Sequence, residues 1–176
     1  RPETVIVFHD GFRLLRWGGW FRRAGMRNVI LDTHQYLIAM EDPLFSGPAR
    51  RLYLRSRRLP WLYRMLVGAS SIAIRSAARR IPVLVGEWCV ENQWALHSQN
   101  RSAAYRQVSR LQRAAWDVSA GQIYWSYQLA RSAKPGSGEG KPPRDPRNGG
   151  NLEAWDLTRV WRHGWIRADT SHDDVP

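Results

Sequence analysis

The segment from Ile81 to Trp88 constrains the fold of this chain more than any other. It reads Ile-Pro-Val-Leu-Val-Gly and then reaches a single carboxylate, Glu87. An apolar, β-branched run of this length indicates a strand buried on both faces, as in a parallel sheet. A carboxylate at the C-terminal end of such a strand is poorly placed for packing and well placed to face a cleft. The alternative is that Glu87 simply ends the strand and points into water.

Three further segments repeat this arrangement. Short β-branched runs with polar or aromatic side chains at their ends cover Thr4 to Phe8, Asn28 to Thr33 and Gly121 to Tyr127. His9-Asp10-Gly11 follows the first run, and His34-Gln35-Tyr36 follows the second. Functional groups of parallel α/β barrels project from the C-terminal ends of the strands. The sequence therefore predicts an α/β chain that forms half of a (β/α)8 TIM barrel, with about four β/α units.

The length of the chain sets the size of this fold. Its 176 residues suffice for one domain, whereas a full barrel needs about 250. We expect one domain over 1–168, with a mobile Pro- and Gly-rich loop over 132–151 and a frayed tail over 169–176. Because the chain starts almost directly on a strand and without Met, we expect that its natural N-terminal part is absent.

Between the strands the sequence predicts connectors and helices. Gly18-Gly19 argues against a long helix between Phe12 and Met26, and the Arg101–Ala120 stretch carries one apolar stripe that Gly121 closes. The remaining predictions are a loop over Glu41–Gly47 and helices over Pro48–Arg58 and Trp61–Arg80 broken at Pro60. A final helix is expected over Leu152–His163, with Trp155, Leu157, Val160 and Trp161 packed.

The composition admits a competing function. The net charge is +12, almost all of it from arginine, and such a charge is typical of proteins that bind nucleic acid or another polyanion. The arginines are spread over the chain without a nucleic-acid motif, so we expect no specific nucleic-acid partner. The ten Trp residues indicate a carbohydrate ligand instead, because sugar rings stack on indole rings. No signal peptide or bilayer-length apolar stretch occurs in the sequence given, so no membrane partner is expected and the localisation stays open.

The single cysteine, Cys89, allows no intrachain disulfide and is expected to be a small buried hydrophobe. No metal-ligand spacing occurs, although His9 and His34 are able to meet in space. In extended geometry His34 and Tyr36 share a side, and Asp32 joins them if the strand stays regular.

The motifs in their order resemble glycoside hydrolase family 5. They are Val-Ile-Val-Phe-His-Asp, Asn-Val-Ile-Leu-Asp-Thr-His-Gln-Tyr, Val-Gly-Glu-Trp, and Ile-Tyr-Trp-Ser-Tyr with a later Ala-Trp-Asp-Leu. The branch they resemble most is the exo-β-1,3-glucanases, and they correspond to strands five to eight of that family's barrel. The resemblance implies a retaining glycosidase that acts on β-glucan without a cofactor, and it is compatible with a secreted parent enzyme.

The resemblance also implies roles for single residues. Glu87 matches the nucleophile, and Tyr36 matches the phenol that hydrogen-bonds it. His34 matches a position that lines the subsite beside the scissile bond, and Trp125 matches the aromatic platform under the sugar ring. His9 borders the cleft as a substrate-contacting candidate. The alternatives are that His34 is a hydrogen-bonded core histidine, Tyr36 a strand-surface aromatic and Trp125 a core residue.

One departure from the family pattern bears on whether the isolated chain can catalyse hydrolysis. Retaining hydrolysis needs a second carboxyl group about 5–5.5 Å from the nucleophile. The family carries it in an Asn-Glu pair, and this chain has no such pair. None of the nearby acids matches that position; they are Asp10, Glu41, Asp42 and Glu91.

The chain is therefore expected to carry the nucleophile without the general acid/base. A half barrel also leaves two sheet edges and an apolar face that need a partner segment or self-association. The open alternatives are a carbohydrate-binding remnant without catalysis and a basic polyanion-binding protein.

Overall fold

The computed structural model describes residues 4–45, 59–129 and 151–167, with the side chains of 42–45 excepted. The chain is an α/β protein in this part. The elements follow in the order β1 Ile6–His9, α1 Leu14–Arg23, β2 Val29–His34, α2 Leu37–Phe45, α4 Leu59–Ala78, β3 Val83–Trp88, α5 Gln93–His97, α6 Arg101–Trp116, β4 Gly121–Tyr124, the 3-10 turn η1 Leu152–Trp155 and α7 Leu157–Arg162.

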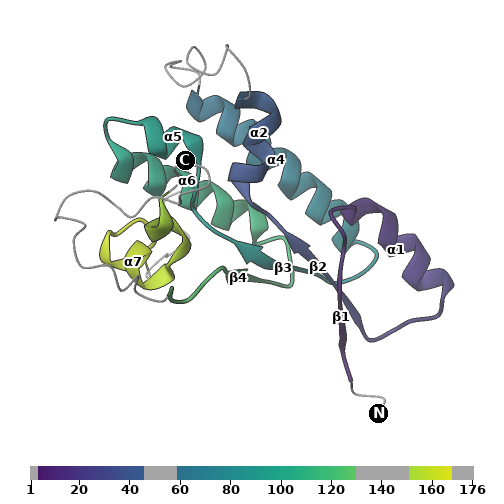
Figure 1. Cartoon of the computed structure of the whole chain (residues 1–176). Coiled ribbons are helices and arrows are strands. Elements are labelled where there is room, and N and C mark those ends of the chain that lie inside the picture. The colour runs from purple at the N-terminus through teal and green to yellow at the C-terminus, as the bar shows by residue number, and fades with distance from the viewer. Residues whose placement is uncertain (1–3, 46–58, 130–150, 168–176) are drawn as a thin grey trace.

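The four strands form one parallel sheet in the order β1-β2-β3-β4 (Figure 1). The predicted α/β class and the four predicted strands are confirmed. β4 ends at Tyr124, earlier than the predicted Tyr127, because the next backbone groups find other partners. The Trp125 N–H still donates to Trp88 of β3, but the Ser126 N–H donates to Trp155 of η1.

One face of the sheet packs against helices. α1, α4 and α6 lie in a row along it (Figure 1). The strand residues Leu31, Val83 and Val85 are completely buried there, in one hydrophobic cluster with Phe21 of α1 and Trp116 of α6. Alternation along a strand sends the intervening residues to the other face.

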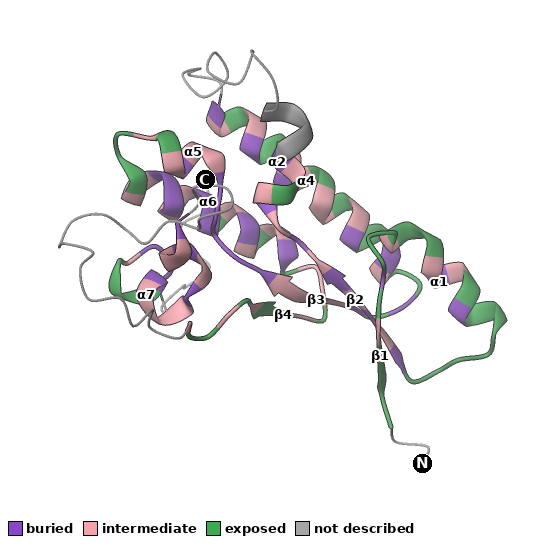
Figure 2. Cartoon of the chain, viewed as in Figure 1, coloured by how far each residue is buried: buried purple, intermediate pink, exposed green. Residues whose placement is uncertain are grey.

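That second face carries no helix among the described residues. Val7 and Ile123 are 55% and 51% exposed on the two edge strands. In the sheet register Val7 pairs with Ile30, and Leu84 pairs with Gly121, so a band of apolar side chains crosses this face. Figure 2 shows that most of β1 is exposed, with Phe8 the one residue of intermediate burial in the strand. Exposed apolar faces of this kind mark interaction sites.

Two helices contradict the sequence predictions. α1 forms over ten residues despite Gly18-Gly19, because Gly18 is buried and a side chain there would meet the Arg80 Cβ at 3.0 Å. Close packing against the chain before β3 thus offsets the poor helix propensity of glycine. The predicted loop over Glu41–Gly47 is wrong up to Phe45, where α2 ends, and its last two residues lie outside the described residues. Glu41 is fully buried in α2 and accepts a hydrogen bond from the Gln93 backbone.

The second predicted helix begins at Leu59 rather than at Trp61. Pro60 therefore lies in the first turn of α4, where a proline N–H is not needed. The predicted helix over Pro48–Arg58 lies outside the described residues.

The C-terminal predictions also need correction. α6 ends at Trp116 rather than Ala120, and Gly121 opens β4 without capping the helix. The predicted helix over Leu152–His163 is divided into η1 and α7 by Asp156, whose carboxylate accepts from the Arg159 backbone and caps α7. Trp161 was expected to pack but is 45% exposed.

Asp156 itself is 1% exposed. Burial acts to raise the pKa of this carboxyl group, but hydrogen bonds from Thr158, Leu129 and Arg159 outweigh it and hold the pKa below its usual value. The ionised form of Asp156 therefore stabilises the start of α7.

The predicted loop over 132–151, apart from Asn151, and the predicted tail over 169–176 lie outside the described residues. Cys89 is buried, as predicted. In the described part of the chain, no helix combines the length and the apolar character needed to cross a membrane.

Candidate functional site

The predicted site residues His34 and Glu87 lie at the C-terminal ends of β2 and β3, and Asp32 of β2 lies on the same side as His34, as expected for a regular strand. The register between the two strands slips there: Thr33 pairs with Val85, and His34 pairs with Glu87. β3 thus contains one extra residue, Gly86. A bulge of this kind re-aims the side chain that follows it. Without the slip Glu87 would point to the helix-covered face, and with it Glu87 shares a face with His34.

Gly86 is required at this bulge. A Cβ at this position would lie 2.0 Å from Asp32 Oδ1, a distance that no side chain tolerates. The Asp32 carboxylate therefore occupies the space that any other residue at position 86 would need. This close approach fixes Asp32 against β3 and directs its other oxygen, Oδ2, to His34.

Glu87 is held by two groups on one oxygen. The Tyr36 hydroxyl donates to Glu87 Oε2 at 2.7 Å, and His34 Nδ1 lies 3.1 Å from the same oxygen. Neither group contacts Oε1. The Glu87 side chain is 24% exposed, so the carboxylate is oriented and still reachable from solvent.

His34 connects two carboxylates. Its Nε2 lies 3.2 Å from Asp32 Oδ2, opposite the Nδ1 contact to Glu87. A neutral imidazole has one N–H and an imidazolium has two. Both carboxylates receive a hydrogen bond at once only when the ring is protonated.

Tyr36 stays a neutral donor. Burial raises the pKa of its phenol far above the ordinary value, and the hydrogen bond to Glu87 raises it further. The phenol therefore keeps its proton at neutral pH and acts as a hydrogen-bond donor to Glu87. The structure brings together Glu87, His34 and Tyr36, which the sequence predicted to be close.

His9 lies beside this group, on the exposed end of β1. Its ring centroid is 4.3 Å from that of His34, and its Nδ1 accepts from the Gly11 N–H at 3.2 Å. The neighbouring Asp10 is buried and accepts from the Phe12 N–H and the Thr33 hydroxyl. Asp10 thus shapes the turn, while His9 borders the site.

Aromatic side chains frame the site. Trp125 follows β4 directly and is 49% exposed; its backbone N–H donates to Trp88, the residue after Glu87. Trp155 lies against the Tyr36 ring at 5.1 Å, with 30° between the planes. Phe12 is 75% exposed and contacts both histidines, with centroids 5.3 Å from His9 and 6.4 Å from His34.

Sequence reasoning missed Trp155 and Phe12. Trp155 was expected to pack in the last helix, and no local signal places it against Tyr36. Phe12 had a usable signal, because it follows His9-Asp10-Gly11 at a strand end. Its φ of 60° is in the left-handed region, which is rare for an aromatic residue and typical of functional turns.

The other nearby acids are occupied by backbone groups. Besides Asp10, Glu41 accepts from the Gln93 N–H and Glu91 accepts from the Asn151 N–H, and both are at most 1% exposed. None of them presents a carboxyl group to solvent beside Glu87, and the side chain of Asp42 is outside the described residues. Across 4–45, 59–129 and 151–167, no group of three or more His, Cys, Asp and Glu is arranged to hold a metal ion.

Comparison of the sequence with protein-family models gave no match, and comparison with curated proteins gave none either.

Proposed function

We propose that this chain carries the nucleophile half of a retaining glycosidase site that acts on β-glucan. One observation carries the proposal: Glu87 is held through Oε2 by Tyr36 and His34, while its Oε1 is engaged by neither. A nucleophilic carboxylate needs this combination of fixed orientation and one available oxygen. The half-exposed indole of Trp125 supplies an apolar surface for a sugar ring at the same sheet edge.

The chemistry assigns one step to Glu87. Oε1 attacks the anomeric carbon, the bond from that carbon to the leaving oxygen breaks, and the electron pair leaves with that oxygen. The leaving oxygen takes a proton from a general acid. Water then attacks the glycosyl ester, gives up a proton to the conjugate base, and releases Glu87 as a carboxylate with the β configuration retained.

Tyr36 and His34 position the nucleophile and modulate its charge. The neutral phenol donates to Oε2 and stabilises the carboxylate before attack. As the ester forms, the negative charge on Glu87 disappears, and His34 keeps its second contact to Asp32. The imidazole therefore holds its place through both steps because two carboxylates orient it.

We propose that the general acid lies on four further strands that complete a (β/α)8 barrel of the exo-β-1,3-glucanase type. The sequential parallel order of β1 to β4 supports this, because among the described residues it leaves β1 and β4 as the two edges of a parallel sheet. The apolar side chains Val7 and Ile123 of the uncovered face are the surface that such strands would bury. The missing strands come from another segment or from self-association.

The second candidate is a carbohydrate-binding remnant without catalysis. The burial of Asp10, Glu41 and Glu91 favours it, because none of them can protonate a leaving group beside Glu87. An activated substrate separates the two functions. Dinitrophenyl β-glucoside has a leaving group that departs without a proton, so the first step needs no general acid.

We expect the chain to release dinitrophenolate slowly, followed by absorbance. Glu87→Gln should release none, and Glu87→Ala should release it again when azide replaces the nucleophile. The matched control is Asp117→Asn, an exposed acid on the far side of the sheet, which should behave as the parent. Binding of laminari-oligosaccharides without any release would support the remnant, and equal release by Glu87→Gln would remove Glu87 from the mechanism.

A further inference from the structure

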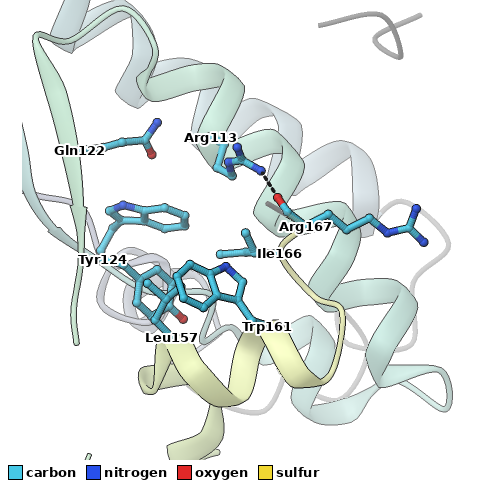
Figure 3. A pocket seen from close by; sticks show the side chains of 8 residues that line it. Arg113, Gln122, Tyr124, Leu157, Trp161, Ile166 and Arg167 are labelled. Carbon is cyan, nitrogen blue, oxygen red and sulfur yellow. Dashed lines mark hydrogen bonds between the residues drawn. The ribbon is translucent and has the colours of Figure 1, made fainter. Parts of the chain in front are cut away.

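A hollow of about 420 Å³ lies on the helix-covered side of β3 and β4 (Figure 3). Its floor includes Trp88, the residue next to Glu87, and neighbouring residues of a strand point to opposite faces. The hollow and the candidate active site are therefore back to back across the sheet. Its volume falls within the range of about 300–1,000 Å³ that small-molecule sites occupy.

The apolar part of the hollow is suited to a ring. Trp161 projects into it from α7 (Figure 3) and is 45% exposed, although the sequence predicted it to be packed. Tyr124 and Ile166 line the hollow with it. An exposed indole with apolar neighbours is a stacking surface for a flat ligand.

Two buried polar atoms of the hollow lack a partner among the described residues. They are Trp88 Nε1, on a side chain that is only 4% exposed, and Gln122 Oε1. One is a donor and the other an acceptor. Buried polar groups without partners cost free energy, and a polar ligand in the hollow would relieve that cost.

Positive charge gathers at the rim. Arg113 of α6 and Arg167 both line the hollow, and no carboxylate of the described residues does. Arg113 donates to the Arg167 carbonyl at 3.2 Å, and its guanidinium carries five N–H donors in all. The acid nearest to the rim in sequence, Asp117, accepts from the Gln122 amide at 3.3 Å. Guanidinium groups bind carboxylates bidentately.

We propose that this hollow binds a small carboxylate carried on a ring. The ring packs against Trp161, and the carboxylate binds the guanidinium groups of Arg113 and Arg167. A neutral sugar would use the indole but not the two cations. An aromatic acid and a uronic acid share the proposed chemistry, and the experiment separates them.

The test is a ligand-observed NMR titration of the full chain with benzoate and with glucuronate, each beside its neutral analogue, benzamide or glucose. We expect at least one of the two acids to bind with a dissociation constant on the order of 1 mM, as is typical for so small a ligand. The neutral analogues should bind at least about tenfold more weakly. The acid that binds more tightly identifies the ligand as aromatic or as a sugar acid.

Variants locate the site. Arg113→Met and Trp161→Ala should each weaken binding about tenfold or more, with the fold checked by circular dichroism. Arg167→Met, outside any helix, gives a second test if Arg113→Met fails to fold. The matched control is Arg110→Met on the exposed side of α6, which should leave binding unchanged. The proposal is overturned if neither acid binds, if benzamide equals benzoate, or if Arg110→Met weakens binding as much as Arg113→Met.

Discussion

A methyl group at Gly86 should disrupt the β-bulge that directs Glu87 to the same face as His34. The added Cβ of Gly86→Ala would lie 2.0 Å from Asp32 Oδ1 and 2.7 Å from its Cγ. The bulge and the Asp32 carboxylate cannot both keep their positions. Asp32 must rotate away and give up its 3.2 Å contact with His34, or β3 must shift.

Two effects lower the free energy of unfolding of the Gly86→Ala chain. Overpacking costs about 1–3 kcal/mol, and loss of a partly solvated charged contact adds about 1 kcal/mol. We therefore predict a loss of about 2–4 kcal/mol in the free energy of unfolding, or about 4–16 °C in Tm for a chain of this size. Urea and thermal denaturation followed by circular dichroism measure both quantities.

A control variant and a double mutant test the predicted clash at Gly86. Gly68→Ala, in α4 with nothing within 4 Å of its Cβ position, should instead stabilise the chain by about 0.5–1 kcal/mol. Adding Asp32→Ala to Gly86→Ala should recover at least about 1 kcal/mol relative to additivity, because the clash is removed. A Gly86→Ala chain as stable as the parent, or an additive double-mutant cycle, would refute the bulge geometry.

Three further predictions follow from the same structure. Tyr36→Phe removes a partly buried, charge-assisted hydrogen bond to Glu87 and should slow dinitrophenolate release about 10–100-fold, measured by absorbance; an unchanged rate would contradict its role. Because the pKa of Asp156 is lowered on folding, its contribution is present above the unfolded pKa of about 3.9 and is lost as pH falls through the folded value. Asp156→Asn should therefore melt below the parent at about pH 6, with the gap closing towards about pH 2; a gap independent of pH would exclude this linkage. The uncovered face should make the chain self-associate in sedimentation velocity, and Val7→Lys with Ile123→Lys should reduce this; a monomeric, cooperatively melting parent would contradict it.

The sheet and the core of the site could be predicted from local sequence. Apolar β-branched runs indicate buried parallel strands, and the C-terminal ends of such strands meet at one edge. Alternation predicted that His34 and Tyr36 share a side, and the resemblance to glycoside hydrolase family 5 implied that Tyr36 contacts Glu87, as the 2.7 Å hydrogen bond shows. Alternation along β2 also placed Asp32 on their side, as the 3.2 Å contact with His34 shows.

The remaining features depend on tertiary contacts that no local pattern reports. α1 forms through Gly18 because that glycine packs against Arg80, which propensity cannot reveal. The bulge at Gly86 exists because Asp32 fills its space from another strand. Trp155 reaches Tyr36 from a segment far along the chain. Local sequence predicts where strands end. It does not predict the register between strands or aromatic contacts between distant segments.

The most direct measurement traps the covalent intermediate on this chain. A dinitrophenyl glucoside with fluorine beside the anomeric carbon needs no general acid to react and gives a glycosyl ester that hydrolyses slowly. After incubation and proteolysis, mass spectrometry should find one fluoroglucosyl group on the peptide that contains Glu87, and none on the Glu87→Gln chain. A label on any other side chain, or equal labelling of Glu87→Gln, would contradict the assignment of the nucleophile.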